Sequence, residues 1–379
     1  MVLLLIGFSF SLFLIALLIG KGKKTAVDKV LLAIFAVYAL TSGGTYIELY
    51  NVENDYPFPH LMNINWLFLL LHGPLLWLYV KALTTHDFKW KPVFAVHLIP
   101  FGLLAILHSF TFLNLSAHDK VEQLKDEAFT NSLYFTVGIV AVGISSISYN
   151  ILALSLLRKH LIRIKNNFST IEDKDLQWLK TLVIASLVIF SLNVSLYNLN
   201  NYLRFADYYE MAKVAYSFST FYVFYIGYFG IKQGTIFVRE PDNPADQQSE
   251  NQFEKGISKS TADNSLEMIM KLSRLMEIEQ PYLDPELSLA RLSNLLKSRP
   301  EVVSEVLNNS LGQSFFDYIN KQRIEAFKIK CLSKDYQHLS IMGIAFECGF
   351  NSKAAFYRAF SKFEGVSPTV YMARMTNKS

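Results

Sequence analysis

Long apolar runs dominate the first 232 residues, and they lack the polar stripe that marks a helix on the surface of a soluble protein. An α-helix rises about 1.5 Å per residue, so about 20 apolar residues cross a hydrocarbon layer of about 30 Å. Seven runs meet this length: residues 2–20, 30–50, 62–83, 92–113, 132–157, 177–200 and 212–232. The pattern predicts a seven-helix transmembrane bundle and disfavours the alternative, a large soluble helical core.

The distribution of Lys and Arg predicts the orientation of these spans. The loops after the first, third and fifth runs hold twelve basic residues, whereas those after the second, fourth and sixth hold four. Positive loops stay in the cytoplasm, so we expect the N-terminus outside and everything after residue 232 inside. The first run has no basic segment before it, which favours an uncleaved span. The alternative, a cleaved signal peptide, leaves six spans and the same cytoplasmic tail.

The composition changes after residue 232. Residues 239–264 are rich in Asp, Asn, Gln, Ser and Pro and poor in aliphatic side chains, so they cannot bury enough surface to become ordered. We therefore predict three parts: a seven-span transmembrane domain over 1–232, a flexible cytoplasmic linker over 233–264 and a soluble helical domain over 265–379. The predicted fold class is all-α.

Apolar residues in the soluble part recur at short helical spacings. Ser288 and Ser340 are each placed to cap a short helix, and Gly349 is placed to turn the chain toward a second helix. A longer helix is expected over 314–332, between these two units. Two helix-turn-helix units about 52 residues apart, joined by one long helix, indicate nucleic-acid binding.

The C-terminal motif IAFECGFNSKAAFYRAFSKFEGVSPTVY resembles the DNA-binding domain of the AraC/XylS family of bacterial transcription regulators. It keeps the family's I-A-x-x-x-G-F, S-x-x-x-F-x-R-x-F and G-x-x-P-x-x-Y, while RIEAFKIKCL and LARLSNLL are similar to its linking helix and first helix. The apolar half resembles a seven-span region fused to such domains, through HGPLLWLYVKALT and HLIPF. The resemblance implies a regulator held in the bacterial inner membrane, and it covers about the last 110 residues most specifically.

The resemblance also implies which residues of the second unit meet DNA. Lys353, Ala354 and Arg358 match base-facing positions, where Arg358 can donate two bonds to guanine and Ala354 can pack on a thymine methyl. Phosphate contacts, which set position but carry no sequence information, are expected from three further residues. These are Asn351, Ser352 and Lys362. The aromatic stripe at Phe350, Phe356, Phe360 and Phe363 is expected to be core.

The first unit departs from the family pattern. Its matching positions are Glu301, Ser304 and Glu305, where basic or amide residues are common. Residues 262–320 hold five Lys and Arg against nine Asp and Glu, whereas 321–379 hold ten against four. Because phosphate attraction dominates affinity, we expect the second unit to bind more strongly. Glu305 has two interpretations: an acceptor for cytosine N4, or a solvated carboxylate.

Polar residues inside the spans suggest a site for a signal. His72, Glu48 and Asn198 are the candidate ligand contacts, and interhelical hydrogen bonding is the alternative interpretation. No catalytic, metal or cofactor site is predicted, because the sequence has no H-E-x-x-H, Gly-rich phosphate loop, nucleophile elbow or cysteine cluster. Cys331 and Cys348 are isolated and are expected to be small core residues in a reducing compartment.

These features predict a sequence-specific transcription regulator, not an enzyme, anchored in the inner membrane. Its expected partners are double-stranded DNA, the lipid bilayer, a small-molecule or envelope signal, and a second copy of the chain in a homodimer. Two alternatives remain open. The membrane part is a passive anchor with regulation by proteolytic release in 239–264, or the chain is a transporter or membrane enzyme with a regulatory tail.

Overall fold

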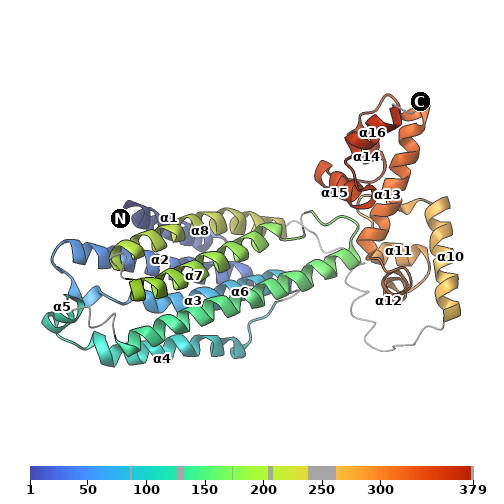
Figure 1. Ribbon diagram of the computed structural model, residues 1–379. Coiled ribbons are helices and arrows are strands. Elements are labelled where there is room, and N and C mark those ends of the chain that lie inside the picture. Colours follow the sequence, from blue (N-terminus) through green and yellow to red (C-terminus); the bar gives the residue numbers. More distant parts are fainter. Residues whose placement is uncertain (86–87, 126–131, 173, 204–207, 238–261, 377–379) are drawn as a thin grey trace. The chain divides into compact units, whose positions relative to one another are not determined.

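The structure, a computed structural model, is built from helices (Figure 1). It describes residues 1–85, 88–125, 132–172, 174–203, 208–237 and 262–376. All regular elements within these ranges are helical, which confirms the prediction of an all-α protein. The helices form two compact units: Met1–Arg158 with Leu176–Glu240, and Lys159–Asp175 with Pro241–Ser379.

Seven segments of the described chain are long and apolar enough to cross a membrane. They are Val2–Gly20, Ala26–Glu53, Pro59–Thr84, Pro92–Leu113, Leu133–Asn167, Gln177–Tyr197 and Tyr209–Lys232. Each overlaps one of the predicted apolar runs, so the prediction of seven candidate spans is confirmed. The side of the membrane on which each end lies stays a prediction.

Five of the spans are formed by single α-helices. These are α1 (Val2–Gly20), α2 (Ala26–Glu53), α6 (Leu133–Asn167), α7 (Gln177–Leu203) and α8 (Tyr208–Phe237). Helix α6 continues ten residues beyond the predicted apolar run, because the polar stretch RKHLIRIKNN keeps the helical conformation. Apolarity therefore marks the part of a helix that fits a bilayer and not the end of the helix itself.

The third and fourth spans are composite. The third has 3-10 turns at Pro59–Leu61 and Asn65–Phe68 before α3 (Leu69–Thr84). The fourth runs as a 3-10 helix, an α-helix and a π-helix, over Pro92–Leu98, α4 (Ile99–His108) and Ser109–Leu113. A short polar helix, α5 (Ala117–Lys125), follows it and was not predicted, because its nine residues carry little apolar pattern.

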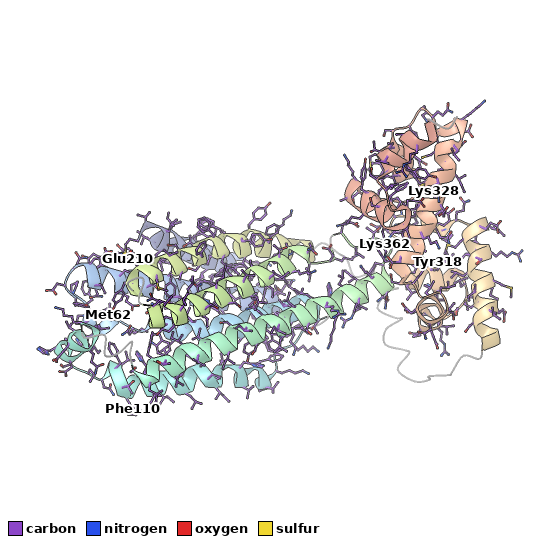
Figure 2. All side chains as sticks on the ribbon, viewed as in Figure 1. Met62, Phe110, Glu210, Tyr318, Lys328 and Lys362 are labelled. Carbon is purple, nitrogen blue, oxygen red and sulfur yellow. The ribbon has the colours of Figure 1, made fainter. Side chains whose placement is uncertain are left out.

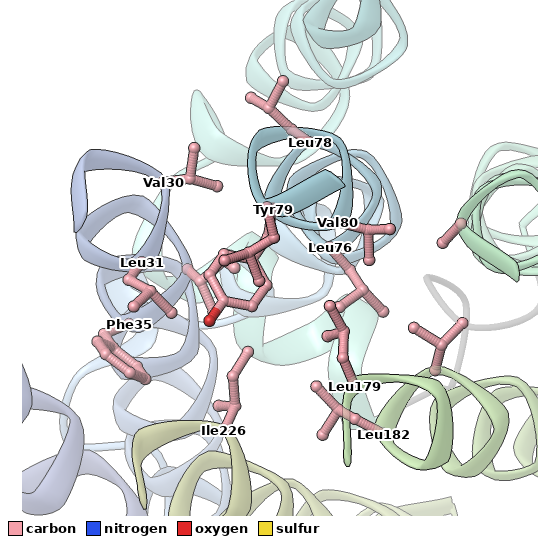
Figure 3. Close-up of a cluster of buried hydrophobic side chains, with 14 of the residues drawn as sticks. Val30, Leu31, Phe35, Leu76, Leu78, Tyr79, Val80, Leu179, Leu182 and Ile226 are labelled. Atoms are coloured by element: carbon pink, nitrogen blue, oxygen red, sulfur yellow. The ribbon is translucent and has the colours of Figure 1, made fainter. Parts of the chain in front are cut away.

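The membrane half, Met1–Arg158 with Leu176–Glu240, has an aliphatic and aromatic core between its helices. Figure 3 shows Tyr79 of α3 surrounded by Leu31 and Phe35 of α2, with Leu179 of α7 and Ile226 of α8 in the same cluster. Many large apolar side chains outside this core point away from the unit, as Phe110 does at 75 % exposure (Figure 2). Such outward apolar surface is what a bilayer would cover.

The C-terminal part contains seven α-helices among the described residues. They are α10 (Ala262–Ile278), α11 (Leu289–Leu295), α12 (Pro300–Glu305), α13 (Phe315–Leu332), α14 (Ile341–Glu347), α15 (Lys353–Glu364) and α16 (Pro368–Thr376). A π-helical turn, Val306–Ser310, extends α12, and 3-10 turns occur at Pro281–Leu283 and Lys334–Tyr336. The predicted capping by Ser288 and Ser340 is confirmed, since their hydroxyls accept from the backbone N–H of Arg291 and Gly343.

Two hydrophobic cores lie on either half of α13. The first gathers side chains of α10, α11 and α12 around Phe315 and Ile319, and the second gathers those of α14 and α15 around Ile324 and Phe327. Each core thus belongs to one of the two predicted helix-turn-helix units. Helix α13 contributes to both, as expected for a joining helix.

The predicted linker 233–264 lies mostly outside the described residues, which omit 238–261. Within the described residues its two ends, 233–237 and 262–264, are helical. Helix α8 continues through Phe237, and α10 begins at Ala262. The predicted linker and domain boundaries stay predictions.

Candidate nucleic-acid interface

Helix α15 is strongly two-faced. Phe356 and Phe360 are fully buried on one side, in ring contact with Phe327 of α13 at centroid distances of 4.6 and 5.6 Å. Lys353 and Arg358 are exposed on the other side, together with Ala354 and Lys362. The helix therefore presents three cations and a methyl group to its surroundings while its aromatic face fixes it to the domain. This exposed face carries the kinds of group that contact base edges in the DNA major groove.

The residues before α15 set its position. The Ser352 hydroxyl accepts from the Ala355 backbone N–H at 3.1 Å and so caps the helix. Gly349 has φ of +89°, and a Cβ there would lie 2.5 Å from the carbonyl oxygen of Tyr282. Only glycine allows the turn before α15 to approach the 3-10 turn before α11 this closely. The predicted phosphate contact Ser352 is thus also a structural cap, and Asn351 beside it is exposed.

Two of the predicted DNA contacts already have anionic partners. Arg358 Nη2 lies 3.1 Å from a carboxylate oxygen of Glu172, and Lys362 Nζ lies 2.6 Å from one of Asp317. Lys353 Nζ lies over the ring of Tyr357, 5.5 Å from its centroid. The exposed cations are therefore held in defined positions. Glu172 is not part of the C-terminal helices but of the chain between α6 and α7.

The first helix-turn-helix unit presents a different surface. Glu301 and Glu305 are exposed on α12, and Ser304 between them is half-buried. Asn308 Nδ2 donates to the Ser304 carbonyl at 2.9 Å and to its hydroxyl at 3.1 Å. The hydroxyl of Ser304 is thus engaged within α12, and two carboxylates remain as the outward groups. The acidic character expected of this unit extends to the helix that would face DNA.

A buried arginine, Arg323, was missed at the sequence level. It is 1 % exposed, and its guanidinium donates to the carbonyl oxygens of Tyr282 and Asp284, both at 2.7 Å. It also donates to Ser169, to the carbonyl at 3.3 Å and to the hydroxyl at 3.1 Å. The available signal was its spacing, four residues from Ile319 and four from Phe327, which places it on the buried face of α13.

Burial lowers the pKa of Arg323 to about 10, and the neighbouring carboxylates of Asp284 and Glu172 oppose that change. The side chain therefore stays charged near neutral pH. A buried charge needs a full set of partners. Arg323 obtains them from the carbonyls of Tyr282 and Asp284, from Asn320 on its own helix at 3.4 Å and from Ser169 between α6 and α7.

Of the candidate ligand contacts in the membrane half, His72 and Glu48 do not share one cavity. His72 lines a small cavity with Tyr38, Ser186 and Tyr222, with about 10 Å³ of room for water-sized molecules. That is space for about one water. Glu48 is buried but does not line this cavity, and the side chain of Asn198 lies outside the described residues. His72 Nε2 instead lies 3.3 Å from the hydroxyl of Thr41, an interhelical contact.

One cluster of the described residues has metal-ligand side chains. His118, Asp119 and Glu122 bring ligand atoms within 4.8 Å of one another on α5. All three are exposed, and the histidine lies 4.0 and 3.9 Å from the two carboxylates, as in a surface ion-pair cluster. Nothing else about this group indicates a metal.

Comparisons with known proteins match the C-terminal part. A family model described as a helix-turn-helix domain matches residues 292–374, from α11 to α16. An uncharacterized HTH-type transcriptional regulator of Staphylococcus aureus (strain COL) is 31 % identical over 101 residues. The match covers 27 % of this chain and spans 13 % of that relative's length. No solved structure matches the chain.

Proposed function

We propose that this chain, which carries an AraC-type helix-turn-helix domain in its C-terminal part, is a sequence-specific DNA-binding transcription regulator held in the bacterial inner membrane. The seven apolar segments would anchor it, and the second unit would read DNA in the cytoplasm. We expect no enzymatic activity. The relative that shares the domain is named a transcriptional regulator, which agrees with this proposal.

The observation that carries the proposal is the exposed face of α15. It combines a planar guanidinium at Arg358, an ammonium at Lys353 and a methyl group at Ala354 on one capped, rigid helix. Arginine is suited to bidentate recognition of guanine, and a methyl group to contact with thymine. Asn351, Ser352 and Lys362 flank this face and would position the phosphate backbone.

The first unit is proposed to contribute less to affinity. Glu301 and Glu305 repel phosphate whatever the sequence, so this unit would add little affinity, and its sequence preference would come from Ser304 and these carboxylates facing the bases. Two units in one chain and four in a homodimer would still give the complex a long footprint. We therefore propose a homodimer on double-stranded DNA.

The seven apolar segments support a multi-pass membrane location. With twelve basic residues on one set of loops and four on the other, the N-terminus would lie outside and the DNA-binding part inside. A small-molecule or envelope signal would act by binding two conformations of the spans unequally. His72, Glu48 and Asn198 stay candidate contacts for such a signal.

Mapping the chromosomal sites bound by the full-length protein tests the DNA-binding proposal. The Arg358→Ala variant is expected to lose these sites while it is still present in the membrane at the wild-type level. Glu305→Ala is expected to keep most sites and to change the base preference at one position. Unchanged site occupancy in the Arg358→Ala variant would count against the docking of α15 in the groove.

A reporter fused after residue 379 tests the proposed orientation. A reporter that is active only in the cytoplasm is expected. A fusion active only in the periplasm would place the helix-turn-helix units away from the chromosome and would refute the function.

A further inference from the structure

The chain between α6 and α7 supplies a short segment, Phe168–Glu172, that packs on the helix-turn-helix domain. Its residues belong to the same compact unit as the C-terminal helices. Figure 1 shows this green chain beside α13 and α15. It runs antiparallel to the residues before α11, with a bridge between Phe168 and Ser288. Ser169 N–H donates to the Leu287 carbonyl at 3.2 Å, and the Thr170 hydroxyl donates to that of Pro285 at 2.7 Å.

Ser169 fills a buried polar site on the domain. It is 2 % exposed. Its carbonyl accepts from Arg323 and from Asn320 Nδ2, each at 3.3 Å, while its hydroxyl accepts from Arg323 at 3.1 Å and donates to the Leu287 carbonyl at 2.7 Å. Every polar atom of Ser169 is therefore engaged by the domain. The surface formed by Arg323, Asn320 and the carbonyls before α11 is built to receive a segment of this kind.

Glu172 extends the same contact to the DNA-reading helix. One of its carboxylate oxygens accepts from the Ile171 backbone N–H at 3.2 Å, and the other lies 3.1 Å from Arg358 Nη2. The Glu172 side chain is only 18 % exposed, whereas that of Arg358 is 62 % exposed. The less exposed carboxylate is thus held by the segment, and the exposed side chain of Arg358 reaches it. The guanidinium that would read guanine is occupied by an anion from another part of the chain.

We propose that Phe168–Glu172 is an intramolecular partner of the DNA-binding surface, and that its docked state competes with DNA for Arg358. This inference rests on the proposed function of α15. The segment is continuous in sequence with α6 on one side and α7 on the other. A signal that changes these two helices can reach Arg358 through the backbone of the segment, without a diffusing messenger. Undocking would free Arg358, and docking would hold it.

The bridge between Phe168 and Ser288 provides a way to trap the docked state. Residues paired in an antiparallel bridge have Cα atoms about 4.5–5.5 Å apart, which a disulfide can span. The doubly substituted Phe168→Cys, Ser288→Cys protein is therefore expected to cross-link on oxidation. The test uses the full chain in nanodiscs and a DNA site selected with the wild-type protein. Affinity is measured by fluorescence anisotropy before and after reduction.

The cross-linked form is expected to bind the site about tenfold more weakly or worse, the size expected for loss of one arginine–base contact, and reduction is expected to restore binding. The reduced form of the same molecule is the control for folding, and Ser288→Cys alone is the control for oxidation. Equal affinity of the cross-linked and reduced forms would overturn the proposal. If neither the wild-type nor the reduced protein enriched any DNA, the proposed function itself would have failed.

Glu172→Gln tests the competition at Arg358 without a cross-link. It is expected to raise affinity about two- to fivefold, the range for an exposed ion pair. Glu267→Gln is the matched control: Glu267 pairs with Lys271 on α10, and its substitution removes the same charge from the same unit. An equal gain in the two variants would show a general charge effect and overturn the assigned role of Glu172.

Discussion

Ser169 and Arg323 lie 154 positions apart in the sequence, yet the guanidinium of Arg323 donates to the hydroxyl of Ser169 at 3.1 Å. Both are almost completely out of water. The hydroxyl also donates to a backbone carbonyl, and only a hydroxyl fills both roles in so small a side chain. This pair joins the helix-turn-helix domain to the chain between α6 and α7.

Replacing Arg323 by lysine is expected to destabilise the C-terminal helix-turn-helix domain. Lysine keeps the charge but offers three donors in place of five, so buried carbonyls of Tyr282, Asp284 or Ser169 lose their partner. A loss of about 2–4 kcal/mol in the free energy of opening is expected. Hydrogen–deuterium exchange of peptides in 281–332 of the full-length protein measures it.

The matched control for this change is Arg291→Lys. Arg291 pairs with Asp284 on the surface and is mostly exposed, so its substitution is expected to cost less than about 1 kcal/mol. If both variants exchanged alike, the Arg323 network would contribute no more than a surface ion pair.

Gly349 and Gly365 form a second matched pair. Both have positive φ, at +89° and +70°, but a Cβ at Gly349 meets the Tyr282 carbonyl while one at Gly365 meets nothing within 4 Å. Gly365→Ala is expected to cost about 1–2 kcal/mol, from backbone strain alone. Gly349→Ala is expected to cost about 3 kcal/mol or more, because the turn must also move away from the first unit. Thermal unfolding, monitored by hydrogen–deuterium exchange of peptides from both cores, measures the difference in stability between the two variants. Equal costs would argue against the close approach of Gly349 to Tyr282.

The two cysteines predict how the second unit responds to alkaline pH. Burial raises the pKa of Cys348 to about 12 and that of Cys331 to about 11, from an ordinary value near 9. Above the ordinary value the unfolded chain loses these protons and the folded domain keeps them. The stability that depends on the neutral thiols is therefore complete below about pH 9 and is lost as the pH rises toward 11–12.

Alkylation by iodoacetamide at pH 9 measures this directly. The thiolate is the reactive form, so Cys348 is expected to react on the order of a hundredfold or more slowly in the folded protein than in denaturant. Cys331 is expected to be intermediate. A Cys348 that reacted at the denatured rate would show that the core around α14 opens freely.

The sequence was sufficient for the parts that local chemistry determines. The spans follow from the length of apolar helix that a bilayer requires, and Ser288 and Ser340 follow from the hydroxyl that a helix start needs. Phe350, Phe356 and Phe360 are buried as predicted, and Phe363 is half-buried against them. Phe327 of the joining helix packs in the same core, with its ring tilted against that of Phe356 and edge-on to that of Phe360.

Contacts between distant parts of the chain could not be predicted. Glu172 and Arg358 are 186 positions apart, and no periodic pattern in FSTIED links that loop to a helix near the C-terminus. Arg323 was predictable as a buried residue from its place between Ile319 and Phe327, but its partner Ser169 was not. Non-local polar contacts depend on the three-dimensional arrangement and leave no signal in one sequence.

The docked segment predicts a reciprocal effect of DNA. If docking and DNA compete for Arg358, then DNA must weaken docking by the same factor by which docking weakens DNA binding. The cross-linking rate follows the docked fraction, so saturating specific DNA is expected to slow disulfide formation in the Phe168→Cys, Ser288→Cys protein. The rate is measured by quenching oxidation at intervals and separating the cross-linked chain. In the same protein carrying Arg358→Ala, DNA is expected to leave the rate unchanged, since the competed side chain is gone. A specific DNA that bound tightly and yet left the cross-linking rate unaltered would mean that the segment stays docked on the DNA complex, and that its role is to support the domain and not to control it.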